Sequence, residues 1–127
     1  MPVEQLADRV ILEHPKVISP QSIACVSSEP AQGATVKILY YGATVISWRS
    51  PDAAGGEPLE RLFVSSKAAL DGTKPVRGGI PIVFPTFGLP ALPQFSKLKQ
   101  HGYARSSTWS FNSVLVDDDS NVSVKLC

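Results

Sequence analysis

The sequence is poor in the residues that build disulfide frameworks and metal sites. It contains two cysteines, Cys25 and Cys127, and two histidines, His14 and His101. Two cysteines without metal-ligand neighbours predict reduced thiols and no metal site. His14 precedes a proline in a polar, strand-like stretch, and we interpret it as structural or exposed. A catalytic histidine therefore has at most two candidates.

Long apolar runs and an excess of charge are also missing. No segment approaches the ~18–20 continuous apolar residues that cross a bilayer, and the N-terminal MPVEQ lacks the apolar run of a secretory signal. We expect a cytoplasmic protein that does not bind membranes. The formal net charge of +1 gives the molecule no general attraction for nucleic acid. GxxxxGK[ST], GxGxxG and HExxH motifs are absent, so nucleoside triphosphatases, dinucleotide enzymes and zinc proteases have no support.

The sequence does contain β-type alternation. Val36, Ile38 and Tyr40 fall on one face, and Thr44, Ile46 and Trp48 continue the same period, which predicts two strands with a bulge or tight bend at Gly42. Residues 109–116 and 122–126 predict a hairpin around the DDDSN turn at 117–121. The remaining expectations are a hairpin loop over 51–58, a β-type run over 59–64, one helical turn over 66–70, a short buried strand over 80–84 and a proline-rich surface loop over 89–93.

The 127 residues match one small domain in size. The alternation over 122–126 continues to the last residues of the sequence without a turn signal, which favours an antiparallel sheet that continues further. An edge strand that closes the domain is the alternative.

Positive charge is concentrated in one loop-rich segment. Residues 67–105 contain six lysines and arginines against one carboxylate, Asp71, so they carry +5 and leave −4 for the rest of the chain. Loops on a β scaffold are where binding groups usually lie. The six cations are Lys67, Lys74, Arg77, Lys97, Lys99 and Arg105. Three of the lysines, at positions 67, 97 and 99, are typical of solvated surface charges.

Two arginines have neighbours that suggest a ligand. Arg77 precedes Gly78 and Gly79, whose missing side chains allow a ligand to approach the backbone amides. Arg105 ends QHGYAR, which also offers the amide of Gln100 and the imidazole of His101. If the two segments are adjacent, two guanidiniums can grip one phosphate or carboxylate. Four aromatic residues are expected mainly in the core, with walls for a sugar ring as the alternative: Phe84, Phe87, Tyr103 and Trp109.

Three ordered motifs resemble the glucose-6-phosphate 1-epimerases, the hexose-6-phosphate mutarotase branch of the aldose 1-epimerase superfamily. They are YGATVISW at 41–48, LDGTKPVRGGIPIVFPTFG at 70–88 and QHGYARSSTW at 100–109. The resemblance implies an antiparallel β-sandwich of the galactose mutarotase type. Residues 1–127 would form the N-terminal part of this single domain, truncated at its C-terminus, and the full-length protein would be a monomer.

The resemblance also implies roles for individual residues. Arg77, Gln100 and Arg105 would contact the ligand, with the arginines on the phosphate, and His101 would position the sugar. In this family a second histidine is the general acid and a glutamate the general base, and both are expected beyond residue 127. The reaction interconverts the α and β anomers of an aldohexose 6-phosphate by ring opening and closure, and it requires no cofactor. Without the acid and base, this chain alone is expected to be inactive or nearly so.

Two other functions remain open. The first is a non-catalytic β-sandwich that binds a sugar phosphate with the same arginines. The second is an interaction protein that recruits a partner through the loop at 89–93 and unpaired strand edges. The second does not explain the concentration of positive charge.

Overall fold

Short antiparallel strands dominate the computed structural model, which describes residues 3–14, 33–117 and 122–127. Five strands form one sheet, in the order of the sequence. They are β1 (Val3–Gln5), β2 (Arg9–His14), β3 (Ala34–Leu39), β4 (Val45–Ser50) and β5 (Leu59–Glu60). A separate two-stranded hairpin joins β6 (Phe111–Asp117) to β7 (Val122–Leu126). The two remaining elements are the 3-10 helices η1 (Pro93–Phe95) and η2 (Ala104–Ser106).

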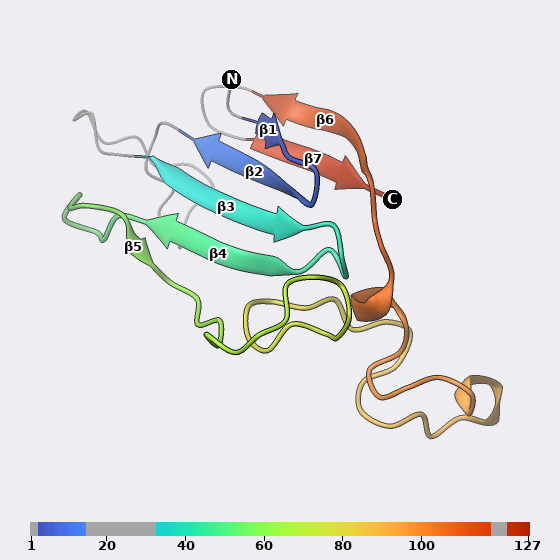
Figure 1. Ribbon diagram of the computed structural model, residues 1–127. Coiled ribbons are helices and arrows are strands. Elements are labelled where there is room, and N and C mark those ends of the chain that lie inside the picture. The colour runs from blue at the N-terminus through green and yellow to red at the C-terminus, as the bar shows by residue number, and fades with distance from the viewer. Residues whose placement is uncertain (1–2, 15–32, 118–121) are drawn as a thin grey trace.

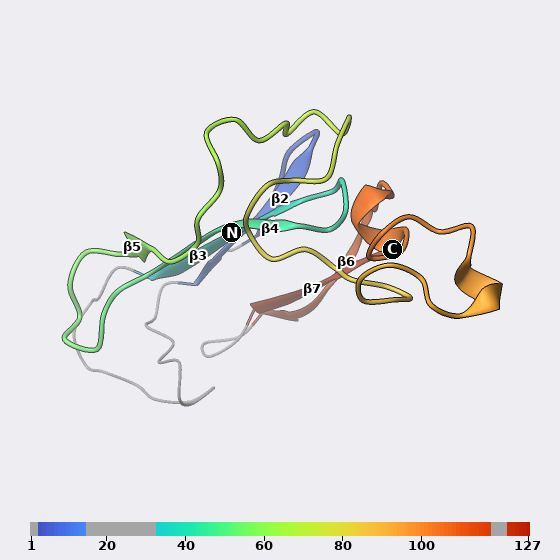
Figure 2. The same cartoon turned by 90° about the horizontal axis from the view of Figure 1, so that it is seen from below.

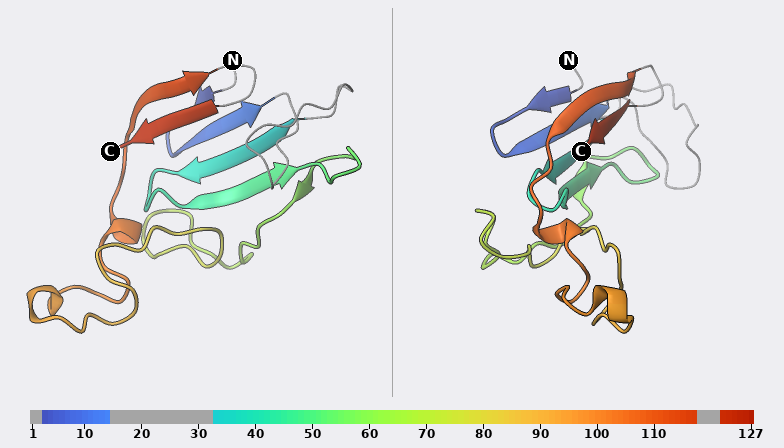
Figure 3. Two further views of the ribbon diagram at one scale, coloured as in Figure 1. Left: turned by 180° about the vertical axis from the view of Figure 1, so that it is seen from behind. Right: turned by 90° about the vertical axis from the view of Figure 1, so that its right-hand side faces the viewer.

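The two sheets share one side of the molecule, and the loops occupy the other. Figure 1 shows the five-stranded sheet with the β6–β7 hairpin beyond its β1–β2 edge, and β7 contacts β2. Seen from below in Figure 2, the hairpin lies to one side of the sheet and does not extend it. Residues 61–109, which form most of the loops, project from the side of the molecule opposite the two sheets, as the views from behind and from the side show (Figure 3). The expected all-β antiparallel fold is confirmed, and no helix in the described ranges is long and apolar enough to cross a membrane.

The most deeply buried side chains lie where β2 and β3 meet the turn that follows β3. Val10 and Leu39 are 0% and 1% exposed, and Thr44, after the turn, is 2% exposed. In the β2–β3 ladder Arg9 pairs with Leu39 and Val10 with Ile38, so both buried side chains lie at the same end of the two strands. Paired residues share a face of the sheet and successive residues alternate, so Val10 and Leu39 lie on opposite faces, and both faces are covered at the end next to the turn.

The β3–β4 hairpin confirms the bend that the sequence predicts at Gly42. Leu39 N–H donates to Thr44 C=O at 2.9 Å and closes the turn. Gly42 has φ of +74°, a conformation that glycine adopts without steric cost. The extra residue lies within β4: Lys37 pairs with Ser47 and Ile38 with Val45, which leaves one residue of β4 unmatched. The hairpin is therefore bulged as well as bent.

Three predicted elements differ from the structure. Residues 80–84 do not form a buried strand, since they make only two isolated bridges, Ile80 with Val45 and Phe84 with Gly102, and Ile80 and Phe84 are 49% and 54% exposed. Pro81 cannot donate to a ladder, and the prolines at 81 and 85 leave few amides for pairing. Residues 66–70 form no helix. They contain only one turn, in which Ala68 N–H donates to Ser65 C=O. The β-type run at 59–64 is a strand only over β5, followed by an isolated bridge between residues 64 and 78.

The other predicted elements are confirmed where the structure describes them. The loop over 51–58 is confirmed between β4 and β5, and the loop over 89–93 is exposed at Leu89 and Leu92. The hairpin predicted near the end of the sequence is confirmed as β6 and β7. Most of its DDDSN turn, residues 118–121, lies outside the described residues, as do Cys25 and the side chain of His14.

The β4–β5 edge is held by one carboxylate. Glu60 accepts hydrogen bonds from Ser47 Oγ at 2.5 Å, Trp48 N–H at 2.9 Å and Leu62 N–H at 3.1 Å. Burial acts to raise the pKa of Glu60, but these bonds together with one from the Arg61 backbone outweigh it, and the pKa is lowered. The ionised carboxylate thus ties the short β5 strand to the sheet.

We predict that Glu60→Gln lowers the melting temperature at neutral pH and weakens its dependence on acid. The ionised form stabilises the fold fully above the ordinary pKa of 4.5, and this contribution is lost as the pH falls through the lower pKa of the folded protein. Circular dichroism melts of the wild type and the variant between neutral pH and pH ~3 measure it. Glu4→Gln, on exposed β1, controls for the loss of one carboxylate charge. Parallel pH profiles for wild type and Glu60→Gln would contradict the assignment.

A second prediction separates strain from steric overlap in the β3–β4 turn. A Cβ on Gly42 would lie 2.5 Å from Arg105 C=O, whereas a Cβ on Gly55, with a similar φ of +79°, meets nothing within 4 Å. Gly55→Ala should cost about 1–2 kcal/mol, the cost of a left-handed conformation. Gly42→Ala should cost about 3 kcal/mol or more, because the overlap with backbone is added. Urea unfolding of both variants tests this, and equal losses would refute the close contact.

Candidate functional site

The segment that carries Arg77 is fixed by main-chain hydrogen bonds on two sides. Ser65 N–H donates to Arg77 C=O at 2.9 Å, and Gly79 N–H donates to Phe63 C=O at 2.8 Å. One residue further on, Ile80 and Val45 exchange N–H···O=C bonds of 2.9 and 3.0 Å. The Arg77 backbone is therefore anchored both to the residues after β5 and to the first residue of β4.

The glycine pair after Arg77 serves this packing. A Cβ on Gly78 would lie 2.3 Å from Phe63 C=O, and one on Gly79 would lie 2.2 Å from Val45 C=O. Real Cβ atoms do not come so close, so the main chain fits only with glycine at both positions. The Gly79 amide is already bonded to Phe63. The expectation that the pair opens its backbone to a ligand is wrong for Gly79, whose amide is taken by Phe63 C=O, and the neighbouring main chain occupies the space beside both glycines.

The QHGYAR segment and the residues after it pack against the turn between β3 and β4, on its β3 side. Gly42 N–H donates to Ser107 C=O at 2.7 Å, and Trp109 N–H donates to Tyr40 C=O at 2.8 Å. Residues 41 and 108 form an antiparallel bridge. Turn residues 40–42 thus hold the QHGYAR segment (residues 100–105), while Val45, three residues later, holds the RGGIP segment (residues 77–81).

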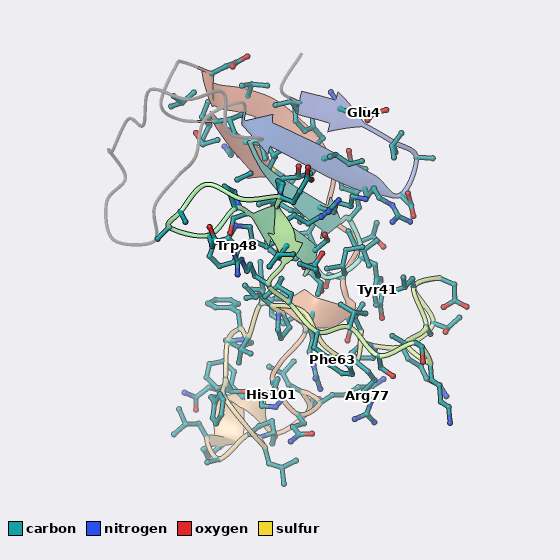
Figure 4. All side chains as sticks on the ribbon, turned by 90° about the vertical axis from the view of Figure 1, so that its left-hand side faces the viewer. Glu4, Tyr41, Trp48, Phe63, Arg77 and His101 are labelled. Atoms are coloured by element: carbon teal, nitrogen blue, oxygen red, sulfur yellow. The ribbon has the colours of Figure 1, made fainter. Side chains whose placement is uncertain are left out.

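The two segments consequently lie at the same end of the molecule. In Figure 4, Arg77 and His101 both lie at the end opposite Glu4, with Tyr41 of the turn between that end and the sheet. No hydrogen bond joins the Arg77 side chain to Gln100, His101 or Arg105 in the part of the chain that the structure describes. The structure brings the candidate residues to one region through their backbones, and their side chains do not bond one another across it.

The two arginines differ in how much of each guanidinium is available. Arg77 is exposed, and its side chain has no hydrogen bond or ion pair among the described residues. Arg105 is half-buried: Nη2 donates to Gln100 C=O at 2.9 Å, while Nε is buried and has no partner within residues 3–14, 33–117 and 122–127. A buried, unpaired donor of a cation is costly, and an anion at that point would remove the cost.

The single carboxylate of this segment does not neutralise either arginine. Asp71 Oδ1 accepts from Thr73 N–H at 3.0 Å and from Thr73 Oγ1 at 2.7 Å. The hydroxyl bond is the main reason that the pKa of Asp71 is lowered, and the amide bond and the nearby Lys74 act in the same direction. Asp71 therefore stays ionised within its own turn and does not pair with Arg77.

Aromatic side chains surround the QHGYAR segment. The rings of Phe84 and Tyr103 meet edge-to-face at 5.9 Å, and those of Phe87 and His101 at 5.1 Å. Phe84, Phe87 and Tyr103 are 54%, 86% and 51% exposed, so the expectation that they lie in the core is wrong for these three. Trp109 is half-buried and donates from Nε1 to Ala104 C=O at 3.1 Å, which favours packing. Exposed rings beside an imidazole and two guanidiniums suit the apolar faces of a sugar.

The sequence reasoning missed Thr86 and Gly88. Thr86 Oγ1 is buried and has no partner in the part of the chain that the structure describes, and Gly88 is hydrogen-bonded to His101 at two points. The only signal was the position of both residues in the PTFG stretch that ends the RGGIP motif. Among the described residues no group of three or more His, Cys, Asp or Glu side chains is placed to hold a metal ion.

Comparisons with known proteins give this arrangement a context. A family described as aldose 1-epimerase matches residues 24–127. A protein of Cenchrus ciliaris, provisionally named a glucose-6-phosphate 1-epimerase, is 38% identical over 97 residues, which are 76% of this chain and 26% of that protein. A protein of Escherichia coli strain K12 with the same provisional name is 37% identical over 78 residues, which are 61% of this chain and 24% of that protein.

Solved structures agree with these matches. A provisionally assigned mutarotase, YeaD, from Salmonella typhimurium aligns with a TM-score of 0.63 and 25% identity over 98% of this chain and 34% of its own. The protein HI1317 aligns with a TM-score of 0.54 and 25% identity over 91% of this chain and 34% of its own. The chain thus spans about a quarter to a third of the relatives that it matches.

Proposed function

The chain belongs to the aldose 1-epimerase family, and on that premise we propose that it forms the phosphate-binding part of a glucose-6-phosphate 1-epimerase. Such an enzyme interconverts the α and β anomers of an aldohexose 6-phosphate. The observation that carries the proposal is the docking of the RGGIP and QHGYAR segments on one hairpin turn, where the Arg77 guanidinium and the buried Nε of Arg105 have no partner among the described residues.

Each candidate residue has a role in this proposal. Arg77 and Arg105 bind the phosphate, because a guanidinium presents several N–H donors to phosphate oxygens in a fixed plane. Arg105 has already committed one Nη2 donor to Gln100 C=O, so it offers its remaining donors. Gln100 is exposed and presents its amide to sugar hydroxyls, and His101 positions the sugar ring. The exposed ring of Phe87 beside His101 supplies an apolar wall.

Chemistry on the bound sugar needs a base for the anomeric hydroxyl and an acid for the ring oxygen. We assign neither role within residues 1–127. The arginines bind the phosphate at a distance from C1, and they hold the ground state and the transition state about equally, which contributes little to turnover. A sugar-phosphate-binding protein without turnover is the alternative, and it uses the same arginines.

We predict that Arg77→Ala weakens the binding of glucose 6-phosphate about 10- to 100-fold, as expected for loss of charge-assisted hydrogen bonds to phosphate. Isothermal titration calorimetry measures the change. Lys97→Ala, which removes an exposed cation of the same segment, should change the affinity less than about twofold. Arg77→Lys should fall between the two, since it keeps the charge and loses the planar fork. Equal effects of Arg77→Ala and Lys97→Ala would show that only net charge matters.

We further predict that the 127-residue chain does not accelerate anomer exchange. Two-dimensional NMR exchange spectroscopy of glucose 6-phosphate should give the same α–β rate with and without the protein. His101→Gln should leave that rate unchanged. Exchange above the solution background that His101→Gln abolishes would contradict the assignment and make His101 a catalytic residue. Binding without exchange is compatible with both the proposed enzyme segment and the non-catalytic alternative, and fusion to the relatives' C-terminal portion would distinguish them.

A further inference from the structure

His101 is held at two points by a single residue. Its N–H donates to Gly88 C=O at 2.8 Å, and Gly88 N–H donates back to His101 Nδ1 at 3.0 Å. Both residues have left-handed backbone conformations, with φ of +66° for His101 and +71° for Gly88. Residues other than glycine seldom adopt a left-handed conformation, and those that do cluster where the surroundings enforce a functional geometry.

Neighbouring contacts fix the rest of the ring and its loop. The Phe87 ring meets the imidazole edge-to-face, with centroids 5.1 Å apart and planes at 62°. Arg105 Nη2 bonds the carbonyl of Gln100, the residue before His101. On the other side, Tyr103 N–H donates to Phe84 C=O at 3.0 Å. The imidazole therefore has little freedom to turn away from Gly88.

The direction of the Gly88 bond determines where the imidazole proton lies. A backbone N–H can only donate, so Nδ1 must present its lone pair to Gly88. A neutral imidazole has one proton, which must then be on Nε2. His101 is half-buried, and Nε2 has no partner among the described residues. The ring thus presents a free N–H donor whose orientation the backbone has fixed.

We propose that Gly88 is a positioning residue that locks His101 in the neutral Nε2–H tautomer, so that His101 donates a hydrogen bond to an oxygen atom of the sugar. This inference rests on the proposed function for the identity of the ligand, but the tautomer itself does not. An uncharged donor has no strong preference for phosphate over a hydroxyl or ring oxygen, whereas the guanidiniums do. The charged and uncharged donors therefore bind different parts of the ligand: the arginines bind the phosphate, and His101 binds the sugar.

NMR of the uniformly ¹⁵N-labelled chain tests the tautomer without any ligand. We expect long-range ¹H–¹⁵N correlations, recorded at mildly alkaline pH, to show a protonated Nε2 and an unprotonated Nδ1 for His101. A ¹⁵N–¹⁵N coupling across the hydrogen bond should connect the Gly88 amide with His101 Nδ1. The variant His14→Asn assigns the signals, because the chain has two histidines. A protonated Nδ1, or an absent coupling, would overturn the proposal.

Two variants then test what the donor does. In His101→Asn the side-chain oxygen can still accept from Gly88 N–H, and asparagine tolerates the left-handed backbone, but the Nε2 donor is lost. We expect an unchanged melting temperature, about fivefold to tenfold weaker binding of glucose 6-phosphate and unchanged binding of inorganic phosphate. His101→Gln, whose amide reaches further, should recover part of the affinity for the sugar phosphate.

The outcomes separate this inference from the proposed function. Wild-type affinity for glucose 6-phosphate in His101→Asn would refute the donor role even if the tautomer is as expected. Equal losses for glucose 6-phosphate and inorganic phosphate would also refute it, because the variant would then have disturbed the phosphate site. Failure of the wild type to bind glucose 6-phosphate would refute the proposed function and the sugar-donor role together. The NMR result on Gly88 and His101 would stand or fall separately.

Discussion

The loop end of the molecule, residues 61–109, depends on one close backbone contact, that of Gly42 against the chain around Arg105. Gly42 N–H reaches Ser107 C=O at 2.7 Å, and only the missing side chain allows the Arg105 carbonyl to approach. The same turn is closed by buried Thr44 and continues into Val45, which pairs with Ile80. Everything proposed for the phosphate and the sugar follows from this turn, since both arginine segments take their position from it.

Hydrogen bonds between main-chain groups, rather than a large apolar core, hold these segments. The buried apolar side chains of the described residues are Val10, Ala34, Leu39, Ala43 and Ala104. Phe63 and Phe87, in contrast, are 79% and 86% exposed. A region with few buried apolar contacts and many loop hydrogen bonds opens at low free energy cost. Binding of a phosphate across the two segments would then stabilise the loop end by mass action.

The sequence allowed the strands with clear alternation to be predicted, because a period of two and turn residues are local signals. β3, β4, β6 and β7 appear where expected, and Gly42 marks the bend.

The apolar residues at 80–84 were misleading, since burial depends on a partner surface that a local pattern does not specify. The roles of Gly78 and Gly79 were missed for the same reason: their neighbours, Phe63 and Val45, are distant in sequence. Arg77, Gln100, His101 and Arg105 could be selected from the motifs, but the bond between Gly88 and His101 depends on a left-handed backbone that no letter encodes.

The central claim is that Arg77 and Arg105 bind one phosphate although they come from segments held on opposite sides of a turn. Side-chain NMR of the arginine Nε–H groups during a titration with glucose 6-phosphate tests it most directly. We predict that the Nε–H signals of Arg77 and Arg105 shift together and reach half-saturation at the same ligand concentration, while those of Arg9, on β2 and ion-paired with Asp8, stay in place. Different half-saturation points for the two arginines, or a shift of only one of them, would contradict a shared site.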